Sequence, residues 1–347
     1  MQKNMIDNEL IKKYNKIIKD AREESKLEYC LCCKKKTSSF CNSHSLPKFV
    51  LKNLSEKGMV LTSNHFLEMP FIKEEKGLNN SGTFHRICRE CDNSLFKIYE
   101  DENKIYEEPR KKAMCQIDLK NCLKMYDKRL NEVALYSKMI NISEGFLLDE
   151  LLEKQKVNFL DLNEIANEFN RSFDILNKKS TSSYELIYWK TLEYVAPIGF
   201  QGHIALVGDL NGGVINDIYN HSYKYVIENL NLCVFPLKEK TIVLMFVSKE
   251  NKKYKYFIKQ FKKLNEEDKL NLISFIIFNY SEEFFLSPNT KKKILENEDI
   301  RVITKNTTDM IALDENMAKM MRNYKFSELK EFRKFPNLLS KENSLHN

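Results

Sequence analysis

The spacing of hydrophobic residues predicts helices in the first half of the chain. Around residues 8–25, Leu10, Ile11, Tyr14 and Ile17 recur every three or four positions, which is typical of an amphipathic helix. The same spacing runs through residues 93–140 and 145–178. Pro109 disfavours helix just before it, so we expect two helices joined near residues 107–110.

The pattern becomes strand-like after the polar stretch at residues 180–183. Four segments rich in β-branched and aromatic residues follow, separated by glycines, and they predict strands at 184–200, 203–210, 224–237 and 241–248. Helical spacing returns at residues 254–264 and 268–280. The predicted fold class is therefore α+β, with a C-terminal α+β domain that has its own core.

Shorter elements are expected between residues 27 and 105. We predict strands at 40–44, 59–61 and 83–87, a short helix starting near Leu46, and a further helix from Asp92 onward. The expected organisation is an N-terminal helix at 1–26, a zinc module at 27–105, a helical region at 106–180 and a C-terminal domain at 181–347.

Two C-x-x-C pairs delimit this module and predict a structural zinc site. Cys30, Cys33, Cys88 and Cys91 supply four sulfur ligands, which suit the tetrahedral shell of Zn²⁺. The ion would replace a hydrophobic core that so short a segment cannot build alone. The ligand set stays open, because either of two further cysteines, Cys32 and Cys41, could replace a neighbouring cysteine as ligand. Cys115, Cys122 and Cys233 are expected to be core thiols.

Composition and charge exclude few classes of protein. The chain has 347 residues, 56 basic and 49 acidic side chains and a net charge of +7, which permits a local nucleic-acid-binding patch without requiring one. No apolar run reaches the roughly 18–20 residues that span a bilayer, and the N-terminus lacks an apolar signal core. We therefore expect a cytoplasmic protein with no membrane partner.

The module resembles the HNH (His-Asn-His) nuclease family, whose ββα-metal fold often carries a pair of zinc knuckles. The resemblance rests on the run Ser43-His44-Ser45-Leu46-Pro47 between the cysteine pairs and on Asp92-Asn93 directly after the second pair. It covers roughly residues 27–100. It implies that His44 is the general base and that a catalytic Mg²⁺ or Mn²⁺ lies between the end of its strand and the following helix. A neutral imidazole suits this role at cellular pH.

This chain departs from the family pattern at two positions. Ser43 stands where an acidic metal ligand is expected, and Thr83 where the central Asn is expected. Asp92 is therefore the candidate catalytic carboxylate and metal ligand, with His85 as a further possible ligand. Other roles stay open: Asp92 as an N-cap of the helix, and His44 as a zinc ligand or a hydrogen-bonded strand-end histidine. His65, His203 and His221 are expected to be incidental.

These residues support two predictions of function. The first is a metal-dependent, HNH-like endonuclease that cleaves DNA, with DNA favoured over RNA and with Lys48 and Arg86 holding phosphates. Small nuclease modules fused to a larger domain resemble effectors of bacterial defence systems, and the C-terminal domain would then sense a signal, bind a protein partner or form a homo-oligomer. The alternative is a non-catalytic, zinc-dependent protein that binds nucleic acid or protein.

Overall fold

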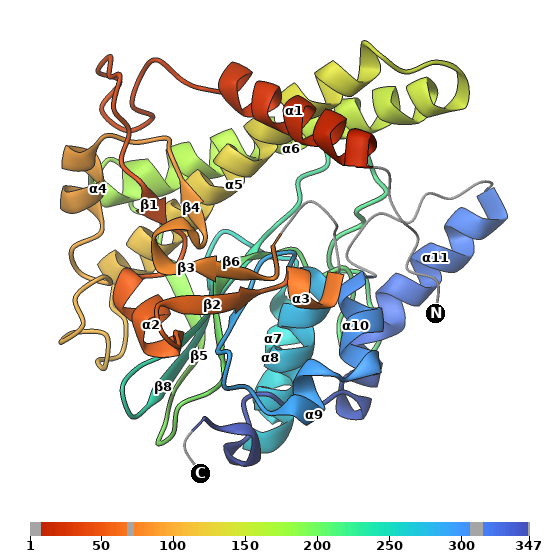
Figure 1. Ribbon diagram of the computed structural model, residues 1–347. Helices are drawn as coiled ribbons and strands as arrows, with labels where there is room; N and C mark the ends of the chain where they lie inside the picture. The colour runs from red at the N-terminus through yellow and green to blue at the C-terminus, as the bar shows by residue number, and fades with distance from the viewer. Residues whose placement is uncertain (1–7, 68–72, 306–314, 346–347) are drawn as a thin grey trace.

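A computed structural model describes residues 8–67, 73–305 and 315–345. The first third of the chain forms short elements, which are α1 (Asn8–Glu24), β1 (Ser43–His44), α2 (Lys48–Leu54), β2 (Met59–Thr62), α3 (Asn64–Leu67), β3 (Glu75–Gly77), η1 (Leu78–Asn80), β4 (Thr83–Phe84) and α4 (Arg89–Leu95). Two long helices follow, α5 (Lys111–Ile140) and α6 (Gly145–Leu176), and they pack against each other as a hairpin (Figure 1).

The last part of the chain contains strands followed mainly by helices, but two predicted strands have other bounds. Residues 184–200 form two strands, because bends separate Leu192 from Ile198, and the strand expected at 203–210 already ends at Ile204. The elements of this part of the chain are β5 (Tyr184–Leu192), β6 (Ile198–Ile204), β7 (Leu230–Pro236), β8 (Thr241–Ser248), α7 (Lys255–Lys263), α8 (Glu266–Tyr280), β9 (Phe285–Leu286), α9 (Lys292–Leu295), α10 (Glu298–Lys305), α11 (Glu315–Ser327), η2 (Glu328–Lys334) and η3 (Lys341–Asn343). The mixture of a helical middle and antiparallel strands confirms the α+β class.

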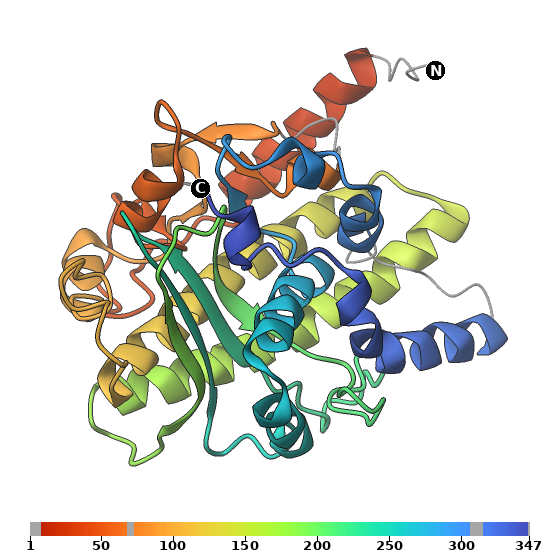
Figure 2. The same ribbon diagram turned by 90° about the horizontal axis from the view of Figure 1, so that it is seen from below.

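Seven strands form one antiparallel sheet in the order β3-β2-β9-β6-β7-β8-β5. Both faces of its centre are buried, because odd and even positions of β8 belong to different core clusters. Val243 and Met245 face the cluster that contains α7 and α8, whereas Leu244 faces the cluster that contains α5 and α6. Helices therefore cover both faces of the sheet (Figures 1 and 2), which explains the nearly continuous apolar sequence of these strands.

The sheet contains strands from two regions that the sequence predicts to be separate, residues 27–105 and residues 181–347. Leu61 of β2 pairs with Leu286 of β9, and Leu286 also pairs with Ile198 of β6. One core cluster likewise contains buried residues from both ranges, such as Val60 and Phe246. The C-terminal region shares its sheet and part of its core with the insertion between the two cysteine pairs.

The helix expected from Asp92 to residue 107 is shorter in the structure. Helix α4 already begins at Arg89 and ends at Leu95, and turns connect it to α5. The Gln116 carboxamide on α5 accepts hydrogen bonds from the backbone N–H groups of Ile98 and Tyr99, at 3.0 and 3.2 Å. These bonds satisfy backbone donors that a longer helix would have used itself.

Candidate functional site

The four cysteines of the two C-x-x-C pairs lie together, with their sulfur atoms within 4.8 Å of one another. A tight turn carries Cys30 and Cys33, and Lys34 closes it with a positive φ of 59°. Cys88 is the N-cap residue of α4, and Cys91 lies in its first turn. The sulfur atoms of Cys33 and Cys88 are 3.9 Å apart, close to the roughly 3.8 Å expected between two ligands of a tetrahedral zinc–thiolate centre.

The hydrogen bonding of this tetrad fits a soft divalent cation. A hydrogen bond from Cys32 lowers the pKa of Cys30 to about 3, and the backbone N–H of Cys88 also donates to the Cys30 sulfur at 3.3 Å. Burial, by contrast, raises the pKa of Cys91. A bound ion would favour the thiolate at all four positions, because metal binding displaces the thiol protons. The cluster can therefore hold a metal such as zinc.

The two cysteines that left the ligand set open lie outside the tetrad. Cys32 is buried, and its thiol hydrogen bond to Cys30 together with burial raises its pKa. Cys41 donates to a carboxylate oxygen of Asp92 at 3.3 Å. Both thiols therefore support neighbouring groups of the tetrad or of the adjacent site.

A small ββα unit adjoins the tetrad. Strand β1 pairs with β4 in antiparallel register, with Ser43 opposite Phe84 and His44 opposite Thr83, and α4 follows. Successive strand residues point to opposite faces, so Ser43 and His44 reach different surroundings. Ser43 donates to Asp92 on α4 at 2.8 Å, and His44 contacts η1.

The imidazole of His44 is half-buried and held by a backbone carbonyl. Its Nε2 lies 3.1 Å from the carbonyl oxygen of Leu78. A carbonyl can only accept, so Nε2 carries the proton and Nδ1 of the neutral ring has a free lone pair. Burial lowers the pKa of His44, and the nearby charges of Lys48 and Lys120 add to this effect. The ring is therefore neutral at neutral pH, as a general base must be.

Asp92 lies inside α4 and not at its N-cap position, which Cys88 occupies. Burial alone would raise its pKa, but the charge and hydrogen bond of Lys120, with hydrogen bonds from Ser43 and Cys41, lower it below the usual value. The ammonium of Lys120 is 2.9 Å from Asp92 Oδ1 and 3.1 Å from Glu100. The carboxylate is thus ionised, and it accepts hydrogen bonds from Ser43, Cys41 and Lys120.

This arrangement does not fit a catalytic Mg²⁺ or Mn²⁺ at Asp92. Such an ion needs carboxylate oxygens at about 2.1 Å and several further oxygen ligands. The Lys120 side chain, 1% exposed, instead places its ammonium against both carboxylates and 4.1 Å from the centre of the Phe96 ring. A divalent cation and this ammonium would compete for the same oxygens.

The remaining predicted site residues are dispersed. Lys48 is exposed and donates to the side chain of Asn79 at 3.0 Å. His85 directly follows β4, is exposed, and precedes the second cysteine pair. Arg86 is 3% exposed and is directed inward, where it bonds the Ser25 carbonyl at 2.5 Å and Asp127 at 2.7 Å. In this position its guanidinium holds α1 and α5 together and is not offered to a phosphate.

No sequence pattern predicted a second cluster of potential metal ligands. Asp118 and Cys122 on α5 and His203 on β6 bring their ligand atoms within 4.8 Å of one another. Asp118, however, already accepts hydrogen bonds from Tyr184 and Asn231 at 2.9 and 2.7 Å, besides its 2.9 Å contact with His203. The cluster is best described as a buried polar network, and the expectation that His203 is incidental was wrong.

No protein-family model matches the chain, and comparisons with curated proteins and with solved structures give no match either. Along the described ranges, no helix combines the length and the apolar character required to cross a lipid bilayer. The fold and site define an α+β protein that carries a cluster of four cysteines able to hold a metal ion.

Proposed function

We propose that the protein is an HNH-like nuclease in which a zinc-stabilised ββα unit presents His44 as the general base for phosphodiester hydrolysis in DNA. The observation that carries the proposal is the state of His44: burial keeps the ring neutral, and the Leu78 carbonyl fixes the proton on Nε2. Nδ1 is then the nitrogen that takes a proton from water as it attacks phosphorus.

The zinc and the neighbouring basic residue would serve this reaction indirectly. Zinc in the tetrad would fix the orientation of α4 relative to β1 and β4, since Cys88 and Cys91 belong to α4. Lys48 is exposed at the start of α2, four residues after His44, and its ammonium can neutralise a phosphate beside the base. The proposal includes no second metal ion, because the Lys120 ammonium already pairs with Asp92 Oδ1.

One observation favours a second candidate, a non-catalytic zinc-dependent protein that binds nucleic acid or protein. The buried ammonium of Lys120 neutralises both Asp92 and Glu100, so the position that the family resemblance assigns to a catalytic cation is filled by a side chain. A module of this kind would bind zinc and present a surface for nucleic acid or protein, but it would not hydrolyse phosphodiesters.

A plasmid-nicking assay separates the two candidates. Wild-type protein and the variants His44→Ala and His85→Ala are incubated with supercoiled DNA in buffers that contain Mg²⁺, Mn²⁺ or a chelator too weak to remove structural zinc. We expect His44→Ala to abolish cutting while its zinc content stays unchanged, and His85→Ala, an exposed histidine at the end of the same hairpin, to retain cutting. Cutting by His44→Ala at the wild-type rate contradicts the proposal.

Absence of cutting by the wild type in all three buffers favours the binding protein. Gel-shift titration of the same preparations with DNA and RNA then measures the binding that this second candidate requires. Zinc analysis accompanies each variant, so a loss of activity through loss of the metal is recognised.

A further inference from the structure

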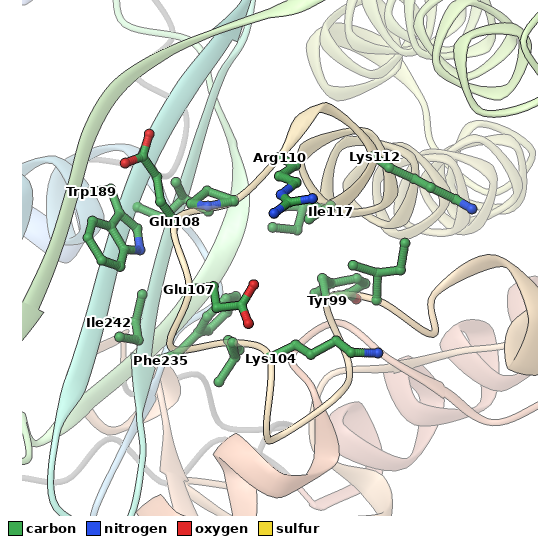
Figure 3. A pocket seen from close by; sticks show the side chains of 15 residues that line it. Tyr99, Lys104, Glu107, Glu108, Arg110, Lys112, Ile117, Trp189, Phe235 and Ile242 are labelled. Atoms are coloured by element: carbon green, nitrogen blue, oxygen red, sulfur yellow. The ribbon is translucent and has the colours of Figure 1, made fainter.

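A cavity of about 440 Å³ lies at the start of α5, away from the tetrad and from His44. The turn at residues 98–110 forms one wall, and residues of β5, β7 and β8 form the other (Figure 3). Apolar side chains make its floor, namely Ile117, Phe235, Ile242 and Leu244. This size is within the range of small-molecule sites, which combine an apolar lining with a few polar groups.

Trp189 provides an aromatic wall of the cavity. It is the only tryptophan of the chain, and its indole Nε1 is buried without a hydrogen-bond partner among the described residues. A ligand with a planar ring would stack against this side chain.

Positive charge gathers at the opposite side of the cavity, where α5 begins. Arg110 is the N-cap residue of this 30-residue helix, no side chain caps the helix, and its first turn has no acidic residue. Within the part of the chain that the structure describes, no ion pair involves Arg110 or Lys112, and both line the cavity. Free backbone N–H groups and unpaired cations at a helix start are favourable for a phosphate.

A carboxylate lies between these two regions. Figure 3 shows the side chain of Glu107 in the middle of the lining residues, below the guanidinium of Arg110, whereas the carboxylate of Glu108 points away. Glu107 is a pure acceptor when ionised, so it suits a ligand with hydroxyl donors between its ring and its anionic group.

We propose that this cavity binds a nucleoside monophosphate. The base lies against Trp189 and Phe235, the ribose hydroxyls donate to Glu107, and the phosphate binds Arg110 and the first N–H groups of α5. A simple hydrocarbon would leave the charged groups unused, and an inorganic anion would leave the aromatic wall unused. The site is independent of the proposed nuclease reaction, since its lining includes neither His44 nor the tetrad.

Tryptophan fluorescence tests the proposal directly, because the only indole of the chain lines the cavity. The full-length protein is titrated with AMP, GMP, CMP and UMP, and at least one is expected to give a saturable change. Arg110→Gln should weaken that binding about tenfold, as loss of a charged hydrogen bond does. Lys97→Gln is the matched control, because Lys97 is an exposed cation of the same connection and does not line the cavity.

Three further titrations identify which part of the ligand is recognised. A nucleoside without phosphate should bind at least tenfold more weakly, and inorganic phosphate alone should not reproduce the signal. A 5′-phosphorylated oligonucleotide distinguishes a free nucleotide from the end of a nucleic acid, and saturable binding of either that depends on Arg110 supports the site. An unchanged affinity in Arg110→Gln, an equal response to inorganic phosphate, or no saturable response to any nucleotide overturns the proposal.

Discussion

The ammonium of Lys120 is the most constrained charge near the candidate site. It lies between the carboxylates of Asp92 and Glu100 and over the ring of Phe96. Attraction between buried opposite charges offsets the loss of hydration only when each charge keeps its partners. Removing the ammonium would leave two carboxylates close together with no counter-charge, so the whole group depends on this one side chain.

We expect Lys120→Met to lower the free energy of unfolding by roughly 3–5 kcal/mol, because methionine keeps most of the volume but not the charge. Urea denaturation measures the change. Lys124→Met on the same helix is the control: Lys124 pairs with Glu283 at 2.6 Å at a more exposed position, and its loss should cost about 1 kcal/mol or less. Equal losses in the two variants would contradict a special role for Lys120.

The pH dependence of cutting follows from the surroundings of His44. Burial lowers the pKa of this histidine below its ordinary value of 6.5, so the base stays neutral, and active, until the pH falls below that value. The nicking rate should therefore be flat above pH 6.5 and decline only in more acidic buffer. The same profile is expected for His85→Ala. An acidic decline that begins above pH 6.5 would assign the titrating base to a different group.

Sequence alone predicted the four cysteines that come together but not the charges beside them. The C-x-x-C spacing places two sulfurs on one turn, so the motif can be recognised from residues that are close in the sequence. Lys120 and Asp92 are 28 positions apart, and His203 and Asp118 are 85 apart, so no short pattern connects them. In the sequence, Lys120 looks like an ordinary helix residue, and only the fold shows that it is buried.

At the scale of elements, the ββα unit depends on the metal-binding turns more than on strand propensity. The sequence predicts strands of five residues at 40–44 and 83–87, but β1 and β4 pair over two residues each. Beyond the pair, Cys41 donates its backbone N–H to Ile87 at 2.8 Å, and the chain then enters the cysteine turns. Two-stranded ribbons of this length have little stability of their own.

We therefore expect purified protein to carry about one zinc ion and Cys88→Ser to lose it, with a large fall in melting temperature. Elemental analysis and thermal melting measure the two effects. Cys41→Ser is the control, since its hydroxyl can still donate to Asp92 and its sulfur is not part of the tetrad. Wild-type protein free of zinc after purification without chelator would contradict the assignment.

Gly82 joins β4 to the large sheet at a position that admits no side chain. Its φ is +60°, and a Cβ there would lie 2.3 Å from Ser45 Oγ and 2.9 Å from the ring of Phe285 in β9. Gly58 offers a comparison, because its φ is +75° but nothing lies within 4 Å of a Cβ. Both glycines have a left-handed backbone that strains any residue with a Cβ, and they differ in the atoms that this Cβ would meet.

Gly82→Ala should consequently destabilise the protein by about 3 kcal/mol, and Gly58→Ala by about 1 kcal/mol. The larger loss adds the cost of displacing Ser45 and Phe285 to that of the left-handed backbone. Denaturant unfolding of both variants gives the comparison. Similar losses would mean that the neighbours of Gly82 move aside without cost.

At the scale of the whole molecule, the sequence predicted that residues 181–347 form strands followed by helices, but not the bounds of β5 and β6 or where their sheet ends. The nearly continuous apolar sequence identifies β7 and β8, because each of these strands packs on both faces. The pairing of Leu61 with Leu286 joins segments more than two hundred residues apart, and β9 has only two residues. Such a contact leaves no periodic signal, so the shared core of the two regions could not be predicted.

A buried polar network connects the helical hairpin to this sheet. His203 of β6 contacts Asp118 of α5 at 2.9 Å and Glu168 of α6 at 3.7 Å, and Arg171 pairs with Glu168 at 3.0 Å. Burial alone lowers the pKa of His203, but the charges of Glu168 and Asp118 outweigh it and raise the pKa above 6.5. Burial likewise opposes ionisation of Asp118, yet the hydrogen bond and charge of His203 lower its pKa below 3.8.

These directions give the network a defined pH window. The raised pKa of His203 contributes stability that is fully present below pH 6.5 and is lost as the pH rises through the folded-state value. The lowered pKa of Asp118 contributes stability that is present above pH 3.8 and is lost on acidification. Both contributions therefore coexist between these two values.

We expect the wild type to exceed His203→Gln in free energy of unfolding by about 3 kcal/mol near pH 5.5, because the variant removes the closest cationic partner of the buried Asp118 charge and leaves only Arg171 at 3.9 Å. Glutamine can still donate a hydrogen bond but cannot titrate, so the difference should shrink steadily in alkaline buffer. Urea unfolding at several pH values measures it, with His65→Gln, a histidine of the α3 surface, as the control. A difference independent of pH would show that His203 stabilises the hairpin on the sheet as a neutral ring.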